Sequence, residues 1–377
     1  MWETNIYCLT DLGTVSRGRS RHRPRDDESL YGGEYPFVQT GDIKNANFYL
    51  TKYSQTYNEK GLLQSKLWKK GTLCITIAAN IAETAILGID ACFPDSIVGF
   101  IPFENIADVR YIKYYFDMFK KHMQAISLGA TQDNFSVDKM LKVKFTIPSF
   151  PTQQKIADIL SAYDDLIENN NRRIELLEKV AQDLYKEWFV RFRFPNYKET
   201  KFENGLPKGW IYIPIEEVMD TQNGKGIQLN DEGVFNVYGS NGIIGKFTDY
   251  NNEDALIIGR VGAYCGSVFY DKNKFWATDN TIVVKSKSIK VGNLLAFFTL
   301  RSLNISNFAG GSAQPLITQT LLKRIKILIP TTEINKEFDQ MVTPIFERVR
   351  YLKTMNINLI KQRDLLLPHL MSGKLEV

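Results

Sequence analysis

The longest regular pattern of apolar positions lies in the middle of the chain, between Thr152 and Val190. Apolar side chains recur there at alternating steps of four and three residues, with no Gly or Pro between them, which indicates a helix that buries one narrow stripe. At 1.5 Å per residue the segment predicts a helix of roughly 50 Å, much longer than an average globular helix. The positions of this stripe are Ile156, Leu160, Tyr163, Ile167, Asn170, Ile174, Leu177, Ala181, Leu184 and Trp188.

A second stripe with the same spacing lies near the C-terminus, and each of its positions follows a position of the first by 182 residues. A narrow stripe needs a partner helix, so we expect the two helices to pack as an antiparallel coiled-coil pair. Two unrelated helices on separate cores are the alternative. The positions of the second stripe are Phe338, Val342, Ile345, Val349, Leu352, Asn356, Leu359, Arg363 and Leu366.

Asparagine and proline residues interrupt the two stripes. Each stripe contains one asparagine, Asn170 or Asn356, one layer apart between the copies, and a polar residue at such a position indicates that the register of the pair matters. Pro344 lies inside the second stripe. Because proline lacks an N–H and clashes with the preceding turn, we expect the second helix to be continuous only from about Ile345.

The stretches outside the helices read as two copies of one domain that mixes strands and helices. In the first copy, strand-like runs surround a helical stretch at 109–126, and they lie at 73–77, 84–89, 96–101 and 143–147. In the second copy, the corresponding runs precede a helical stretch at 291–301, and they lie at 255–258, 267–270 and 281–285.

The predicted fold class is therefore α/β (mixed α+β): two domains separated by two long antiparallel coiled-coil helices, with an internal pseudo-twofold repeat. We place the first domain at 1–150, the central helical repeat at 151–192 and a connector rich in Pro and Gly at 193–209. The second domain spans 210–330, and the C-terminal helical repeat spans 331–377.

Composition restricts the class of protein. The 377 residues are 44% hydrophobic and 24% charged, as in a soluble globular protein. No apolar run approaches the ~18 residues of a membrane span, and the N-terminus does not have the pattern of a secretion signal. Four cysteines without CxxC spacing and three histidines argue against disulfides or a metal site, so we expect a cytoplasmic protein. The net charge of +5 permits nucleic-acid binding without establishing it.

Two motifs, one at the C-terminus and one in the centre of the chain, carry a family resemblance. The segments KQRDLLLPHLMSGKLEV (361–377) and AQDLYKEWFVRFRFP (181–195) resemble the repeat signatures of specificity subunits of type I restriction–modification systems. The GLPKGW segment before the second domain and FVQTGDIKN (37–45) are also similar to that family. The resemblance covers essentially the whole chain. It implies two target-recognition domains, each of which reads one half of a bipartite site in double-stranded DNA.

The resemblance also implies partners. Two modification (methyltransferase) subunits would dock on the helices, bind S-adenosylmethionine and methylate adenine in each half-site. A restriction/translocase subunit would use ATP and cleave unmodified DNA. No cofactor is expected on this chain itself.

A basic loop is the first candidate DNA contact. Ser16–Arg25 holds five arginines and one histidine in ten residues, a composition that suits phosphate neutralisation. A solvated basic loop is the alternative, because the acidic residues at 26–28 offset part of the charge. Further candidates are polar residues near glycines, since Gln, Asn and Arg can form paired hydrogen bonds with base edges. The same segments also read as plain turns.

The first-domain candidates at 39–44 are expected on a turn around Gly41, and those at 222–225 and 240–241 are expected to be their second-domain equivalents. The pair at 260 and 264 lies in the glycine-flanked GRVGAYCG. Gln132 and Gln314 occupy matching places and are expected to serve the fold or the DNA backbone. The DNA-binding candidates are Arg17, Arg19, Arg21, Arg23, Gln39, Thr40, Lys44, Gln222, Asn223, Lys225, Ser240, Asn241, Arg260 and Tyr264.

No catalytic residues are predicted. The chain contains no Asn/Asp-Pro-Pro-aromatic motif for amino methylation and no Walker loop. The nuclease-like Glu199–Lys201 lies in the connector and reads as a chance match. A stand-alone DNA-modifying or cleaving enzyme with fused recognition domains is the main alternative, and a coiled-coil scaffold without a DNA role is another. Trp188, Phe189 and Phe192 are expected to pack in a core, although contact with a partner is an alternative.

Overall fold

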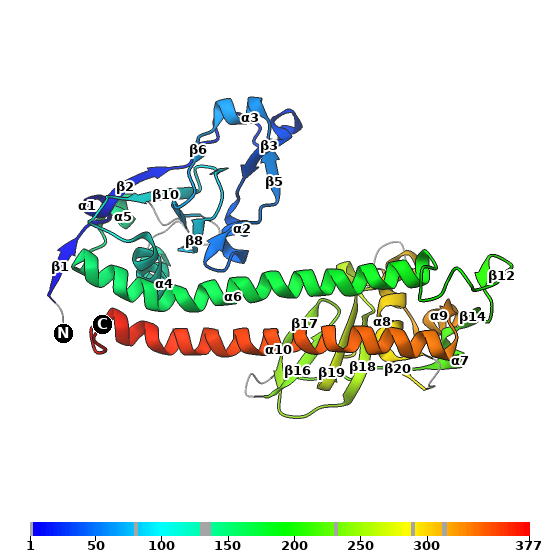
Figure 1. The fold of residues 1–377 in the computed structure, drawn as a ribbon. Coiled ribbons are helices and arrows are strands. Elements are labelled where there is room, and N and C mark those ends of the chain that lie inside the picture. Colours follow the sequence, from blue (N-terminus) through cyan, green and yellow to red (C-terminus); the bar gives the residue numbers. More distant parts are fainter. Residues whose placement is uncertain (1–2, 79–81, 129–136, 230–232, 288–290, 311–314) are drawn as a thin grey trace. The chain divides into compact units, whose positions relative to one another are not determined.

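The computed structural model describes residues 3–78, 82–128, 137–229, 233–287, 291–310 and 315–377. Contacts between residues divide the chain into two compact units (Figure 1). Unit 1 contains Met1–Arg172 and Leu352–Val377, and unit 2 contains Arg173–Tyr351. Each unit is one mixed α/β domain together with a part of each long helix, so the predicted fold class is confirmed.

The two long helices are α6 (Phe150–Tyr185), which continues as a π-helical turn at Lys186–Val190, and α10 (Thr332–Met371). In unit 1, Asn170 of α6 donates a hydrogen bond of 2.8 Å to Asn356 of α10. In unit 2, the Trp188 ring lies 5.8 Å from the Phe338 ring, centroid to centroid. Residue numbers therefore rise along one helix as they fall along the other, which confirms the antiparallel pair.

Every position of the two apolar stripes is buried or partly buried. In unit 1 the stripes share a core with the domain, and Ile156, Leu160 and Leu370 in it are fully buried. In unit 2 the end of α6 contributes an aromatic cluster: Trp188 and Phe189 are 5% and 6% exposed, and Phe192 packs on the core. The prediction that these aromatic residues pack in a core is confirmed.

The expectation for Pro344 is wrong, because α10 is continuous from Thr332 through the proline. The reason is tertiary packing. Phe338 and Val342, which precede the proline, are fully buried in the core of unit 2, so they hold this part of the chain helical. Pro344 itself faces solvent, and so does Gln340, whose carbonyl loses its helical partner and remains open to water.

The domain of unit 1 is built on two sheets and a two-stranded ribbon. The five-stranded sheet runs in the order β2 (Gly13–Arg17), β10 (Ile97–Pro102), β7 (Leu73–Thr76), β8 (Thr84–Leu87) and β4 (Tyr49–Leu50). The four-stranded sheet runs in the order β5 (Gln55–Tyr57), β3 (Tyr31–Phe37), β9 (Ala91–Cys92) and β6 (Leu67–Trp68). The ribbon pairs β1 (Thr4–Tyr7) with β11 (Phe145–Pro148).

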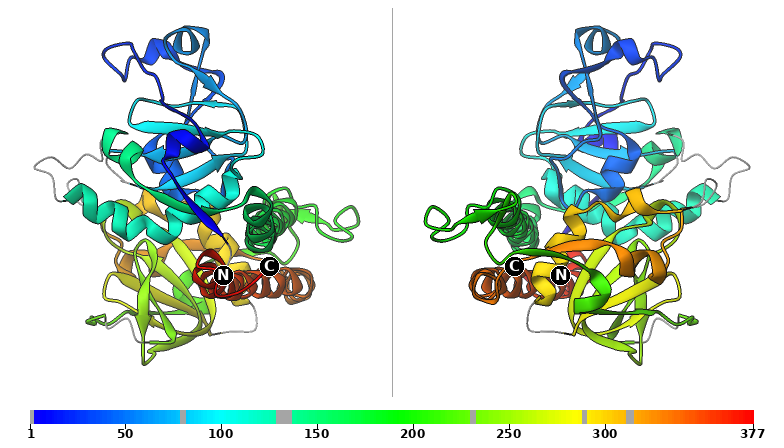
Figure 2. Two further views of the ribbon diagram at one scale, coloured as in Figure 1. Left: turned by 90° about the vertical axis from the view of Figure 1, so that its left-hand side faces the viewer. Right: turned by 90° about the vertical axis from the view of Figure 1, so that its right-hand side faces the viewer.

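Helices connect this domain to the long helix pair. The helix α4 (Val109–Leu128), in cyan to green in Figure 2, packs against β8. It also contacts α6, where the Tyr114 hydroxyl donates a hydrogen bond to Asp164. The shorter helices of the domain are α1 (Leu9–Leu12), α2 (Thr40–Asn45), α3 (Glu59–Gln64), α5 (Val137–Lys142) and the 3-10 turn η1 (Glu28–Leu30).

The domain of unit 2 has one six-stranded sheet. Its order is β15 (Met219–Asn223), β20 (Thr281–Ser286), β18 (Asn252–Gly259), β19 (Val268–Ala277), β16 (Phe235–Gly239) and β17 (Gly242–Phe247). Two ribbons pair β14 (Ile211–Pro214) with β21 (Lys326–Ile329), and β12 (Phe202–Glu203) with β13 (Leu206–Pro207). Its helices are α7 (Ile215–Val218), α8 (Asn293–Ser302), α9 (Gln319–Arg324) and the 3-10 turns η3 (Gly262–Tyr264) and η4 (Ile305–Phe308).

The two domains repeat the same strand registers. Four neighbouring strands have the same order in the two sheets: β2, β10, β7 and β8 in unit 1 correspond to β15, β20, β18 and β19 in unit 2. Arg17 pairs with Val98 in unit 1 at the place where Asn223 pairs with Ile282 in unit 2. The domains differ between β3 and β5, where unit 1 carries α2 and β4, whereas a tight turn joins the corresponding β16 and β17.

Candidate nucleic-acid interface

In both domains the candidate residues gather around one turn at the end of the central sheet. In unit 1, the N–H of Gly18 donates to the carbonyl of Ile97 (2.8 Å), and the N–H of Arg19 donates to Phe93 (3.0 Å). In unit 2, the N–H of Gly224 donates to Thr281 (3.1 Å), and the N–H of Lys225 donates to Ala277 (2.9 Å). We call this place, with the segments 17–25, 39–44, 222–225, 240–241 and 260, the polar edge of each unit.

This geometry corrects one expected equivalence. Gln222, Asn223 and Lys225 do not correspond to the segment at 39–44. The strand registers instead match Asn223 to Arg17, and the backbone hydrogen bonds match Lys225 to Arg19. The second-domain segment QNGKG is therefore the counterpart of the start of the basic loop.

A close approach of two backbones explains the glycine at this position in both units. An added Cβ would lie 2.3 Å from the carbonyl oxygen of Pro94 at Gly18, and 2.0 Å from that of Thr278 at Gly224. Only glycine fits against the turn in this way. The residues on either side of it therefore lie directly beside the turn.

Three arginines of the basic loop are used within unit 1. The guanidinium of Arg19 donates from Nε to the carbonyl of Ser65 (2.7 Å), and that of Arg23 donates to the carbonyl of Ser20 (2.8 Å). Arg25 forms an ion pair of 2.8 Å with Asp95 on the turn. These contacts hold the loop on the domain and direct the three positive charges toward protein oxygens.

Arg17 and Arg21 are the two arginines of the loop whose side chains point outward. Both are exposed, and within the described part of the chain neither side chain forms a hydrogen bond or an ion pair. Arg17 lies on β2, so the basic loop begins after this residue and not at Ser16. Of the loop arginines, these two are the ones positioned to meet a phosphate.

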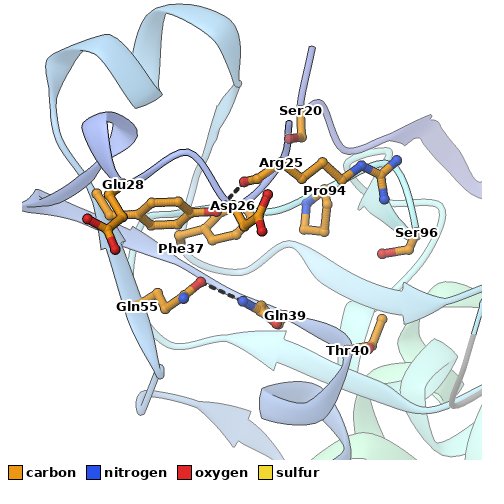
Figure 3. Close-up of a pocket in the computed structure, with 11 residues that line it drawn as sticks. Ser20, Arg25, Asp26, Glu28, Phe37, Gln39, Thr40, Gln55, Pro94 and Ser96 are labelled. Atoms are coloured by element: carbon orange, nitrogen blue, oxygen red, sulfur yellow. Dashed lines mark hydrogen bonds between the residues drawn. The ribbon is translucent and has the colours of Figure 1, made fainter. Parts of the chain in front are cut away.

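A pocket of about 480 Å³ lies between the basic loop and the segment at 39–40 (Figure 3). At its wall the amide of Gln39 donates to that of Gln55 (2.5 Å), and the Tyr31 hydroxyl donates to the carbonyl of Arg25 (2.7 Å). Burial raises the pKa of Tyr31 to about 12, so its hydroxyl remains a neutral donor at physiological pH. The lining residues are Ser20, Arg25, Asp26, Glu28, Tyr31, Phe37, Gln39, Thr40, Gln55, Pro94 and Ser96.

The segment Thr40–Asn45 is a short helix, α2, and not the expected turn around Gly41. The carboxylate of Asp42 explains the helix, because it accepts a hydrogen bond of 2.8 Å from the N–H of Gln39 and so satisfies a donor at the start of the helix. Gln39 and Lys44 remain exposed, and Thr40 is partly buried.

In unit 2 the polar edge brings Ser240 and Arg260 together. The hydroxyl of Ser240 donates to the carbonyl of Asn280 (2.8 Å), and the N–H of Arg260 donates to the same oxygen (3.0 Å). Asn241 is exposed beside them, and Tyr264 on η3 is 61% exposed. Gln222 is held aside by its hydrogen bond to Asn252 (2.5 Å).

Two isoleucines at this edge are not among the DNA contacts predicted from the sequence. Ile243 and Ile244 follow the turn between β16 and β17, and they are 56% and 40% exposed. Exposed apolar side chains beside polar ones suit contact with a thymine methyl group. The available signal was a pair of large apolar residues directly after a turn, a pattern that also reads as an ordinary strand.

Other candidates fall elsewhere. Gln132 and Gln314 lie outside the described residues. The four cysteines are free, and the described residues contain no group of His, Cys, Asp or Glu side chains that could hold a metal ion. Within the same residues, no helix has the length and apolar character needed to cross a membrane.

Comparisons with known proteins identify the family. The family model for the type I restriction modification DNA specificity domain matches residues 1–179 and 207–362. The chain is 26% identical to the MjaIX specificity subunit of Methanocaldococcus jannaschii, covering 99% of this chain and 94% of that protein. It is 25% identical to the EcoprrI specificity subunit of Escherichia coli, covering 89% and 88%.

A solved structure shares the fold. The crystal structure of the S subunit of a type I restriction–modification system from M. genitalium matches with a TM-score of 0.63. The match has 16% identity and covers 98% of this chain and 96% of that one. The chain therefore belongs to the type I restriction–modification DNA specificity family, and it is a specificity subunit, not a catalytic one.

Proposed function

We propose that each unit reads one half of a bipartite site in double-stranded DNA through its polar edge. The observation that carries the proposal is the duplication of this edge on the same strands with different side chains. Arg17 of unit 1 lies where unit 2 has Asn223, and Arg19, whose guanidinium is held within the domain, lies where unit 2 has the exposed Lys225. Two domains that recognise different half-sites need the same backbone arrangement with different polar side chains.

The side chains divide into two roles in unit 1. The exposed Arg17, Arg21 and Lys44 neutralise phosphates and orient the domain on the duplex. Gln39 and Thr40, at the wall of the pocket, read base edges. Arg19, Arg23 and Arg25 act indirectly, because they hold the loop in place.

In unit 2, fewer of the side chains that contact the DNA are charged. The amides of Asn223 and Asn241 suit the paired acceptor and donor of adenine, whereas Lys225 and Arg260 suit guanine or phosphate. Ile243 and Ile244 add apolar contact with thymine. Because the two sets differ, the two half-sites differ in sequence.

The helix pair sets the length of the unread spacer and binds the partners. The 36-residue α6 is about 54 Å long, compared with about 34–36 Å for one turn of duplex DNA. Its outward apolar residues, together with those of α10, form a surface for two methyltransferase subunits, which bind S-adenosylmethionine. A restriction/translocase subunit supplies the ATP-dependent step. These exposed residues are Leu176, Val180, Met341, Tyr351, Ile357 and Leu365.

The test separates the two half-sites. The chain is purified with its methyltransferase subunit, and methylated sites are mapped for the wild type, Arg17→Ala/Arg21→Ala and Asn223→Ala/Asn241→Ala. We expect the asparagine variant to relax one half-site alone, by about 1–3 kcal/mol per base contact. The arginine variant should weaken binding to all sequences and reduce the salt dependence of binding by about two phosphate contacts.

Lys198→Ala is the matched control, because Lys198 is exposed in the connector away from both polar edges. It should leave recognition unchanged. The proposal fails if the asparagine variant changes both half-sites equally, or if the chain without a partner transfers methyl groups to DNA.

A second experiment tests the spacer. Removing one heptad from each helix at paired positions keeps the apolar stripes in phase and shortens the pair by about 10 Å. We expect a shorter spacer between unchanged half-sites. An unchanged spacer at unchanged affinity would refute the role of the helices as a ruler.

A further inference from the structure

The repeat within this chain creates a problem of partner choice. α6 and α10 carry apolar stripes of the same spacing at an offset of 182 residues. In an antiparallel pair, α6 of a second copy could therefore take the place of α10, and the reverse, by exchange of helices between chains. Apolar residues alone do not distinguish these pairings from the intrachain pair.

A cluster of asparagines distinguishes the intrachain pair of α6 and α10 from pairs of identical helices of two chains. Asn170 and Asn356 are 1% and 7% exposed, and Asn170 donates a hydrogen bond of 2.8 Å to Asn356. Asn356 in turn donates a hydrogen bond of 2.8 Å to Asn171. The antiparallel register explains why the two stripes carry asparagine one layer apart, because only this displacement places Asn170 opposite Asn356.

An ion pair makes the same distinction independently. Asp164 is 3% exposed, and its carboxylate meets the guanidinium of Arg363 and the hydroxyl of Tyr114. A buried carboxylate without its cationic partner is strongly unfavourable. The intrachain pair supplies that partner from the other helix.

Homotypic pairs lose both interactions. If α6 of a second copy replaced α10, the 182-residue offset would place Ile174 opposite Asn170 and Ala181 opposite Asp164. If α10 of a second copy replaced α6, Leu352 would face Asn356 and Phe346 would face Arg363. Each exchange therefore leaves buried polar groups against apolar side chains.

We infer that Asn170, Asn356, Asp164 and Arg363 are partner-selecting residues, which make each long helix pair with the other and reject a second copy of itself. The inference concerns the helix pair in the absence of DNA, so its test is separate from that of the proposed function.

The test relocates asparagines in the full-length chain without changing their number. The variant N170L/L352N places both asparagines on α10, where they match each other only across two copies. We expect its share of two-chain species, measured by light scattering, to rise about tenfold over the wild type, since removing one buried mismatch of about 1–3 kcal/mol corresponds to a factor of about 5–150. Its thermal unfolding should begin earlier.

The matched control is N170I/I174N/L352N/N356L, which moves the asparagine pair by one layer and keeps the intrachain match. It should have the association state of the wild type and a midpoint of unfolding within about 2 °C of it. If N170L/L352N does not fold while the control does, the requirement for a matched pair is still supported. Equal association of all three proteins, or equal destabilisation of both variants, would overturn the inference.

Discussion

The two units attach their domains to the helix pair at the same place with opposite chemistry. In unit 1, Tyr114 of α4 donates a hydrogen bond to Asp164 of α6, and Asp164 also pairs with Arg363. In unit 2, the Phe298 ring of α8 meets the Phe346 ring of α10 edge to face, with centroids 5.7 Å apart. The contact between domain and helix pair therefore lies at the same place in both units, but it is polar in unit 1 and aromatic in unit 2.

The helix residues of the polar contact have counterparts in the sequence repeat. Phe346 follows Asp164 by the 182-residue offset of the helices, and Arg363 follows Ala181 by the same offset. Burial raises the pKa of Asp164 even though Arg363 and Tyr114 favour its charged form. A buried ion pair is often no more stabilising than well-packed apolar groups of similar size. The polar contact of unit 1 therefore provides pairing selectivity, whereas the aromatic contact of unit 2 provides buried area.

Breaking the ion pair should have the largest effect. We expect Arg363→Ala to lower the free energy of unfolding of unit 1 by about 3–5 kcal/mol, because it leaves the Asp164 carboxylate, which is 3% exposed, without its cationic partner. Hydrogen exchange of α4 and the five-stranded sheet measures this loss, and the exchange of unit 2 serves as the internal reference. A loss below about 1 kcal/mol would contradict the importance of the pair.

Removing the aromatic contact tests the other unit. Phe298 is 4% exposed, and Phe298→Ala should lower the free energy of unfolding of unit 2 by about 3–4 kcal/mol through the cavity that it leaves. Chemical denaturation followed by hydrogen exchange of the six-stranded sheet measures it. Phe298→Leu is the control, and it should lose less than half as much.

Replacing the polar contact of unit 1 by the apolar residue types of unit 2 tests whether position or residue type determines the stability of the contact. The triple variant Tyr114→Phe/Asp164→Phe/Arg363→Ala gives unit 1 the residue types of unit 2. We expect a free energy of unfolding within about 2 kcal/mol of the wild type, since no unpaired charge remains. Asp164→Phe alone should be clearly worse in the same denaturation experiment. If the triple variant is the less stable of the two, position does not govern the contact.

The pH effect of Asp339 should be the smallest, and it should appear in unit 2. Partial burial raises the pKa of Asp339 from 3.8 to about 6. Because the folded state holds this proton more tightly, the free energy of unfolding of unit 2 should fall as the pH rises from about 4 to about 6. We expect about 1 kcal/mol, since Asp339 lies beside Gly292 at the start of α8, where a negative charge is favoured.

Asp339→Asn should remove this step and leave the pH dependence of unit 1 unchanged. Thermal unfolding at pH 4, 5, 6 and 7 measures both. A step of the same size in the variant would assign the effect to another group.

The sequence predicted the long helices well because heptad spacing is a long and redundant signal. It predicted the antiparallel pair, but not the hydrogen bond between Asn170 and Asn356, since that contact depends on the register. Pro344 was misjudged because a local rule was applied where burial of Phe338 and Val342 decides the structure. The strands at 73–76, 97–102 and 281–286 were found, because they are apolar and central to their sheets.

Other features of the structure could not be predicted from the sequence pattern. β3 contains Gly32, Gly33 and Pro36, which normally argue against a strand, and it survives beside β5 and β9 through contacts distant in sequence. The match of Asn223 to Arg17 was hidden because unit 1 carries extra elements between its β2 and β10. The direction of an arginine such as Arg19 cannot be read from the sequence, since its partner at Ser65 lies far along the chain.

The ribbons β1–β11 and β14–β21 have a consequence for inheritance. In each unit the chain arrives at the domain and leaves it on two antiparallel strands paired over four residues, directly before a long helix. A domain is thus a cassette held between two adjacent ends. A genetic exchange that joins at both strands of one ribbon can therefore replace one domain and leave the sequences of the helices and of the other domain unchanged.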